Sequence, residues 1–115
     1  MSLSNPVRVC NGHKVQLHKA VIRFLNGLDP AAWAYSMELI ESLSELGLTR
    51  EFKQLRKVQG DLWEICADTE KPNRRFIRYM FVARKGEFLV TNAYNKQTNK
   101  TPLKEIKLAF KRAKE

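Results

Sequence analysis

The sequence predicts a single α+β domain: a short N-terminal strand, a two-helix hairpin, a three-strand antiparallel meander and a C-terminal helix. At 115 residues the chain has the length of one domain with one hydrophobic core. Apolar residues recur at helical spacing in the first half, whereas β-branched and aromatic runs follow between residues 62 and 94. A basic amphipathic segment ends the chain. This order favours a sheet with its helices on one face.

The N-terminal part is predicted to hold one short strand and a first helix. Residues 7–10 are apolar apart from one arginine and precede Asn11-Gly12, a common turn dipeptide, so we expect a strand there that could extend to Leu17. From about His18, apolar residues recur at helical spacing until Gly27, which ends the expected helix.

The second helix carries clear signals at both of its ends. Asp29 suits the N-cap and Pro30 the first helical position, while Gly47 suits the left-handed residue that follows a helix. Together with the first helix it would form an antiparallel hairpin. The expected buried stripe consists of Trp33, Met37, Ile40, Leu43 and Leu46.

The second half is predicted to be a meander. Residues 48–59 read as a basic connector, followed by a strand at 62–67 and a polar loop. The strand at 76–84 turns at Lys85-Gly86 into the strand at 87–94. These three strands would pair in chain order.

A last helix is expected after the meander. Thr101 could cap it, with Pro102 as its first residue, because the N–H that proline lacks would be unpaired there anyway. Its apolar face would consist of Leu103, Ile106, Leu108, Ala109, Phe110 and Ala113.

Charge indicates the class of partner. The net charge is +9, with 43% hydrophobic and 29% charged residues, which favours a globular protein with a polyanionic partner. No apolar run approaches the roughly 20 residues of a membrane span, and no signal peptide is recognisable. We therefore expect a cytoplasmic protein.

The cysteines and histidines give no strong indication of a metal or cofactor. Cys10 and Cys66 are expected to be reduced thiols, and Cys66 lies in an apolar segment that suits a small buried residue. Cys10, His13 and His18 lie near one another in sequence but lack an evident fourth ligand. No phosphate-binding or dinucleotide-binding loop is present, so we expect no cofactor and no metal.

Three segments together carry a family resemblance: Gly-Asp-Leu-Trp-Glu-Ile at 60–65, Arg-Tyr-Met-Phe at 78–81, and Lys-Gln-Thr-Asn-Lys-Thr-Pro at 96–102. With the order of elements, they resemble the RelE/HigB superfamily of type II toxins, in its phage-derived HigB-like branch. The resemblance implies one RelE-like domain over residues 1–115 that acts as a ribosome-associated mRNA interferase, a metal-independent endoribonuclease. It also implies mRNA and ribosome as partners, and a cognate antitoxin with a helix-turn-helix domain.

The resemblance also implies site residues. Glu64 matches the glutamate of the family's Leu-Trp-Glu strand, Arg78 the arginine of the next strand, and Lys96 the first lysine after the last strand. Tyr94 stands where the family often has an aromatic residue. Two family cations are replaced, one by Cys66 and one by Gln97.

RNA cleavage needs a proton acceptor, a proton donor and charge at the scissile phosphate. Arg78 is the best phosphate ligand, because its guanidinium is a planar fork of donors that is always charged. Lys96 could bind a flanking phosphate or transfer a proton, and Tyr94 could stack on a base at the rim of the sheet. Glu64 could act as a base or orient Arg78.

Further basic residues could add phosphate contacts: Lys100, Arg56 and Lys57. Each assignment has a structural alternative. Arg78 could only pair with Glu64 across neighbouring strands, Tyr94 could be an ordinary strand aromatic, and the remaining cations could be solvated charge. Two rival functions also stay open. One is a non-catalytic nucleic-acid-binding domain of the same fold, and the other is a toxin that poisons DNA gyrase.

Overall fold

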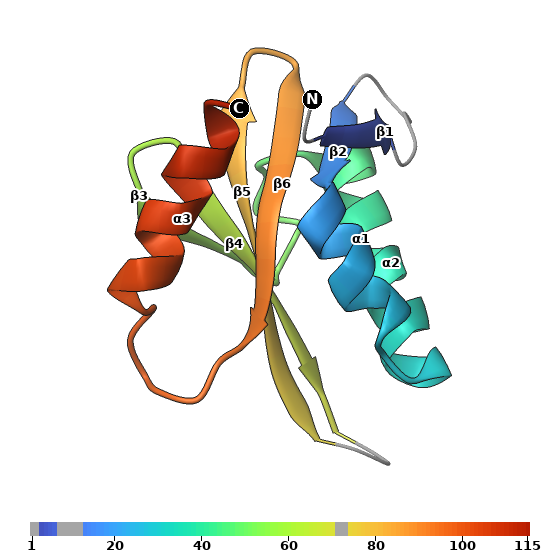
Figure 1. Cartoon of the computed structure of the whole chain (residues 1–115). Helices are drawn as coiled ribbons and strands as arrows, with labels where there is room; N and C mark the ends of the chain where they lie inside the picture. The colour runs from blue at the N-terminus through green and yellow to red at the C-terminus, as the bar shows by residue number, and fades with distance from the viewer. Residues whose placement is uncertain (1–2, 7–12, 71–73) are drawn as a thin grey trace.

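The computed structural model of the chain describes residues 3–6, 13–70 and 74–115. Among these residues, six strands form one sheet in the order β1-β2-β6-β5-β4-β3, and three helices pack on it (Figure 1). The α+β class is confirmed. The strand predicted at residues 7–10 and its turn at 11–12 lie outside the described residues.

The sheet is mixed. Strands β3 to β6 pair with their neighbours in the chain and are all antiparallel, whereas β2 runs parallel to β6 and β1 pairs antiparallel with β2. The strand bounds are β1 Leu3–Pro6, β2 Lys14–His18, β3 Leu55–Gln59, β4 Leu62–Thr69, β5 Arg75–Arg84 and β6 Glu87–Asn95.

The meander has one strand more than the sequence predicts. Residues 55–59, expected to be part of a connector, form the edge strand β3. Its two apolar residues, Leu55 and Val58, are three positions apart and pack on opposite faces of the sheet, so neither face shows a repeated apolar residue. The exposed cations of β3 suit an edge strand, because charge discourages pairing with another chain.

The helices lie on both faces of the sheet, and the expectation of one covered face is wrong. Helices α1 (Lys19–Asn26) and α2 (Pro30–Leu46) cover one face, and α3 (Leu103–Ala113) covers part of the other (Figure 1). Two separate apolar clusters follow from this arrangement, one under each helical layer. No helix within the described residues is long and apolar enough to cross a membrane.

Helix α2 begins and ends as predicted, but its buried stripe is rotated. The Asp29 side chain accepts a hydrogen bond from the Ala32 N–H at 2.9 Å. Gly47 follows the helix at φ 63°. Trp33 is 45% exposed and Leu46 36% exposed, so both lie off the stripe. The buried residues are Ala32, Ser36, Leu39, Ile40, Leu43 and Ser44. Three of them, Ala32, Ser36 and Ser44, have small side chains, which let the helix approach the sheet closely.

Helix α3 starts one residue later than predicted. Pro102 is its N-cap, no side chain caps it, and Leu103 is 63% exposed instead of belonging to the apolar face. Ala109 and Ala113 are the buried residues that contact the sheet. Polar contacts also hold the helix on the sheet: Asn92 Nδ2 donates to Glu105 Oε1 at 2.9 Å, Arg112 Nη1 to the Thr91 carbonyl at 3.0 Å, and Arg84 Nη2 to the Ala113 carbonyl at 2.6 Å.

Candidate functional site

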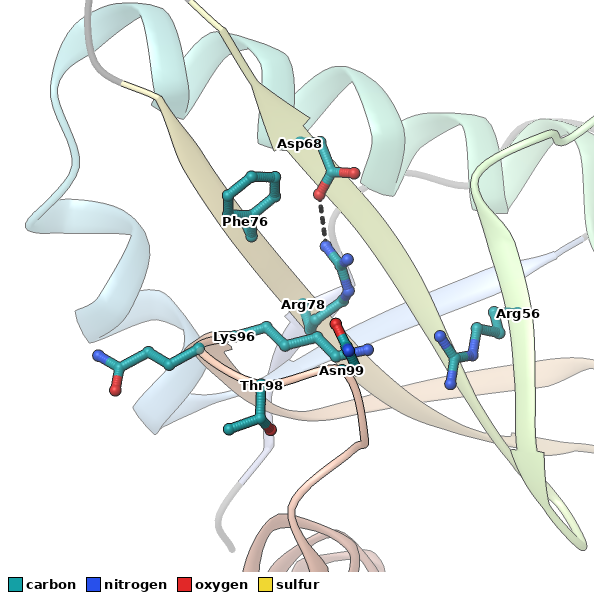
Figure 2. A pocket seen from close by; sticks show the side chains of 8 residues that line it. Arg56, Asp68, Phe76, Arg78, Lys96, Thr98 and Asn99 are labelled. Atoms are coloured by element: carbon teal, nitrogen blue, oxygen red, sulfur yellow. Dashed lines mark hydrogen bonds and ion pairs between the residues drawn. The ribbon is translucent and has the colours of Figure 1, made fainter.

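The α3 face of the sheet carries a hollow of about 420 Å³ (Figure 2). The ends of the central strands form its floor, and the loop that joins β6 to α3 forms one wall. Its lining is mostly charged or polar, and all of it comes from residues 56–99: Arg56, Asp68, Phe76, Arg78, Lys96, Gln97, Thr98 and Asn99.

Strand register explains why residues far apart in sequence meet there. Asp68 on β4 faces Phe76 on β5, and the Lys96 N–H donates to the Phe76 carbonyl at 2.7 Å, so the three form one row across the strands. The next row pairs Arg78 with Tyr94 on β6 and with Cys66 on β4. Side chains two residues apart on a strand share a face, so both rows point to the α3 side.

Arg78 lies at the centre of the hollow, with 8% of its surface exposed. Its Nη1 donates to Asp68 Oδ1 at 2.5 Å and to the Ile77 carbonyl at 3.1 Å, while its Nε has no partner among the described residues. Desolvation lowers the pKa of Arg78, but the hydrogen bond to Asp68 and nearby negative charge outweigh it and raise the pKa overall. The guanidinium is therefore charged and held in one orientation.

Glu64 does not line the hollow. It is fully buried, with Oε1 3.6 Å from Arg56 Nε and Oε2 accepting from the Tyr94 hydroxyl at 3.4 Å. A buried carboxylate is costly unless it is paired, and Arg56 and Tyr94 are its partners. The carboxylate beside Arg78 is Asp68, so neither the pairing of Arg78 with Glu64 nor direct access of Glu64 to a substrate fits this geometry.

Tyr94 is buried, which corrects the expectation that it stands on the rim. Only 9% of it is exposed, and its ring belongs to the apolar cluster under α3. Burial and the charge of Glu64 raise the pKa of Tyr94, so its hydroxyl stays protonated at neutral pH and donates to Glu64. Its ring is not available to stack on a base.

The remaining predicted cations divide into two groups. Arg56 and Lys96 line the hollow together with Arg78. Lys100 lies beyond the lining, in a turn where the Thr98 hydroxyl donates to the Lys100 carbonyl at 2.9 Å. The Lys57 ammonium lies over the Trp63 ring, 5.6 Å from its centroid, and Trp63 packs against the core on the other face.

Five of the eight lining residues are not among the predicted site residues. Three of them, Gln97, Thr98 and Asn99, lie in the 96–102 segment that carries the family resemblance. Asp68 and Phe76 fall in or beside a stretch that reads as a polar loop, but β4 and β5 extend through them. Alternation could have found both, because Asp68 is four residues after Glu64 and Phe76 is two residues before Arg78.

The cysteine and histidines do not belong to this site. Cys66 is half-buried, and burial raises the pKa of its thiol against the opposing charge of Arg78, so a reactive thiolate is not favoured. His13 stacks on Phe88 with 5.5 Å between ring centroids, and His18 Nδ1 caps α1 by accepting from the Ala20 N–H. Cys10 lies outside the described residues. The described residues hold no cluster of three or more His, Cys, Asp or Glu that could bind a metal.

Comparison with known proteins gives a family. No curated protein matches the chain. Residues 23–114, which include all three helices in whole or part and every residue of the hollow, match the family described as phage derived protein Gp49-like (DUF891). The chain therefore belongs to the phage-derived Gp49-like family.

Proposed function

We propose that this protein is the toxin of a type II toxin–antitoxin system, with a RelE/HigB-like fold and mRNA interferase activity. One observation carries the proposal: Arg56 on β3, Arg78 on β5 and Lys96 just after β6 converge on one hollow that also holds a carboxylate. Such a site suits a phosphodiester, which needs cations at the phosphate and a proton acceptor beside it. Membership of a phage-derived family and a net charge of +9 agree with it.

The chemistry can be written with the residues of the hollow. Asp68 accepts the proton of the ribose 2′-hydroxyl, whose oxygen attacks phosphorus and forms the new P–O bond. The bond from phosphorus to the 5′-oxygen breaks, and the Lys96 ammonium donates a proton to that oxygen. The products are a 2′,3′-cyclic phosphate and a 5′-hydroxyl. Arg78 stabilises the charge that grows on the phosphorane, because its position is fixed before the substrate arrives.

Glu64 and Tyr94 act in this proposal as positioning residues. The Glu64 carboxylate holds Arg56 at the side of the hollow, and the Tyr94 hydroxyl holds Glu64. Neither touches RNA. This assignment keeps both residues necessary for the site but replaces the direct catalytic roles that the family resemblance implies.

The proposed partners are translated mRNA on the ribosome and an antitoxin with a helix-turn-helix domain. An acidic antitoxin segment would complement the hollow, since cations outnumber carboxylates in its lining. Neutralisation should therefore weaken as salt is raised.

The test compares wild type with Arg78→Ala and with Arg50→Ala, an exposed arginine outside the hollow. Wild type should arrest bacterial growth and shorten translated messages in primer extension. Arg78→Ala should lose cleavage by about 100-fold or more while still sedimenting with ribosomes, because it removes charge that matters most in the transition state. Arg50→Ala should act like wild type.

The same cells separate the rival functions. Growth arrest with intact messages and relaxed reporter plasmid would favour gyrase poisoning and refute cleavage. Normal growth with ribosome or RNA association retained would favour the non-catalytic domain. Cleavage by Arg78→Ala at the wild-type rate would place the active site elsewhere.

A further inference from the structure

The hollow contains an exposed aromatic residue that the cleavage chemistry does not use. Phe76 is 39% exposed, although residues 77–82 that follow it on β5 are all buried. It is the one apolar side chain among the described residues that line the hollow. A large apolar surface surrounded by charged and amide groups is a common form of ligand site, in which polar groups fix the orientation of an apolar body.

Phe76 lies close to Arg78, the residue that is proposed to bind the phosphate. It lies two residues before Arg78 on the same strand face, a separation of about 6.8 Å. That separation leaves room for one ribose between a phosphate at Arg78 and a base at Phe76. Lys96 is the first residue after the neighbouring strand β6, and its N–H donates to the Phe76 carbonyl, so it continues the same row (Figure 2).

Phe76 also has a cation beside its ring. The guanidinium carbon of Arg74 lies 5.1 Å from the ring centroid. Aromatic rings and guanidinium planes are the two kinds of surface on which proteins stack unpaired RNA bases. Arg74 does not line the hollow and covers one face of the ring, so a base that enters the hollow would stack on the face that Arg74 leaves open.

A second aromatic residue is similarly exposed but lies in different surroundings. Trp33 is 45% exposed on α2, but it does not line the hollow and lies on the helical layer that covers the opposite face. Phe76 differs because it shares its surroundings with Arg78, Lys96 and the amide side chains of Gln97 and Asn99. Amide groups can donate to and accept from the edge of a base.

We propose that Phe76 is the floor of a base-binding subsite, on which an unpaired base of single-stranded RNA stacks while its phosphate lies at Arg78. This inference rests on the proposed function and specifies its substrate as unpaired rather than duplex RNA. Stacking tolerates every base, because every base has a π-face. Any sequence preference would come from Gln97, Thr98 and Asn99 at the wall.

The experiment measures binding of a short 2′-O-methyl RNA that carries one 2-aminopurine. This RNA cannot be cleaved by 2′-oxygen attack, so binding is seen apart from chemistry. Wild type should bind it and quench the fluorescence of the base by stacking. Phe76→Ala should weaken binding by about tenfold or more and abolish quenching. Phe76→Trp should retain both, whereas Phe76→Leu, apolar but without a π-face, should lose quenching.

Trp33→Ala is the matched control and should bind like wild type. Equal quenching by wild type and Phe76→Ala, or full binding by Phe76→Leu, would overturn the subsite. Absence of binding by wild type would also overturn it, and parallel cleavage of translated mRNA would then show that the proposed function survives. Binding and quenching without cleavage of unmodified RNA would instead retain the subsite and refute the interferase.

Discussion

The two faces of the sheet are built from the same strands but differ in what they bury. Under α1 and α2 lies an apolar cluster that includes Phe81, Ile40 and Tyr79. On the α3 face, fully or nearly buried polar groups such as Glu64, Arg78 and Asn92 interrupt the apolar residues. The first face is a continuous core, whereas the second is a core only where α3 covers it.

The difference indicates which face contributes most to folding stability and which face carries the charged candidate site. Buried apolar contacts dominate folding energy, whereas buried charge is costly and persists when it serves a site or is fully paired. On the α3 face the hollow lies beside the loop that leads into the N-terminal end of the helix, and four of its lining residues are charged. Substitutions under α1 and α2 should therefore act mainly on stability, whereas substitutions at the hollow should act mainly on activity.

The largest expected effect on stability is on the first face. Phe81→Ala removes a fully buried ring that meets Phe88 edge-on at 5.5 Å. We expect it to lower the free energy of unfolding by about 3–5 kcal/mol, measured by urea denaturation. Phe76→Ala, the same substitution on the other face of the same strand, is the control and should cost far less. Similar losses for both variants would contradict the contrast between the faces.

An intermediate effect is expected under α3. Tyr94→Phe removes the hydroxyl that donates to Glu64, leaves a buried carboxylate with one partner fewer, and should cost about 1–2 kcal/mol. Tyr79→Phe is the matched change on the first face. It removes the 2.6 Å hydrogen bond to Ser36 Oγ but leaves a hydroxyl that can rotate toward the helix backbone, so it should cost less. A larger cost for Tyr79→Phe than for Tyr94→Phe would argue against a stabilising role of the Tyr94 hydroxyl at the buried Glu64 carboxylate.

The loss of stability at alkaline pH should differ between Tyr94→Phe and wild type. Burial raises the pKa of Tyr94 above its ordinary value of 10.0, so above that pH the unfolded chain releases the proton first and the folded state loses stability as pH rises. Tyr94→Phe lacks this group and should lose less stability than wild type over that range. A parallel decline in both proteins would mean that Tyr94 titrates normally.

The smallest effect is expected outside the hollow. Lys100 is exposed and does not line it, so Lys100→Ala should weaken RNA association only severalfold. It should reduce the slope of log affinity against log salt by about 0.7, the contribution of one phosphate contact on a single strand. Lys14→Ala, an exposed lysine on β2 beside the opposite end of β6, should leave the slope unchanged. A loss of cleavage in Lys100→Ala comparable to that in Arg78→Ala would extend the active site beyond the hollow.

Local chemistry made much of the fold predictable. Asp29, Pro30 and Gly47 act on their own neighbours, so the bounds of α2 could be read directly. The Lys85-Gly86 turn likewise identified the β5–β6 hairpin, where Gly86 adopts φ 70°. Arg78, Lys96 and Arg56 could be named as site candidates from charge and family resemblance, although their roles stay predictions.

Other features depend on contacts between distant segments, and only the tertiary structure decided them. β3 is a strand because β4 pairs with it, since its own sequence has no apolar residue repeated at every second position. Trp33 is exposed and Tyr94 buried because the rotation of α2 and the position of α3 are set by packing, which hydrophobicity alone does not encode. Asp68 rather than Glu64 meets Arg78 because strand register places those two side chains together. Register is a property of paired strands, so no single strand's sequence contains it.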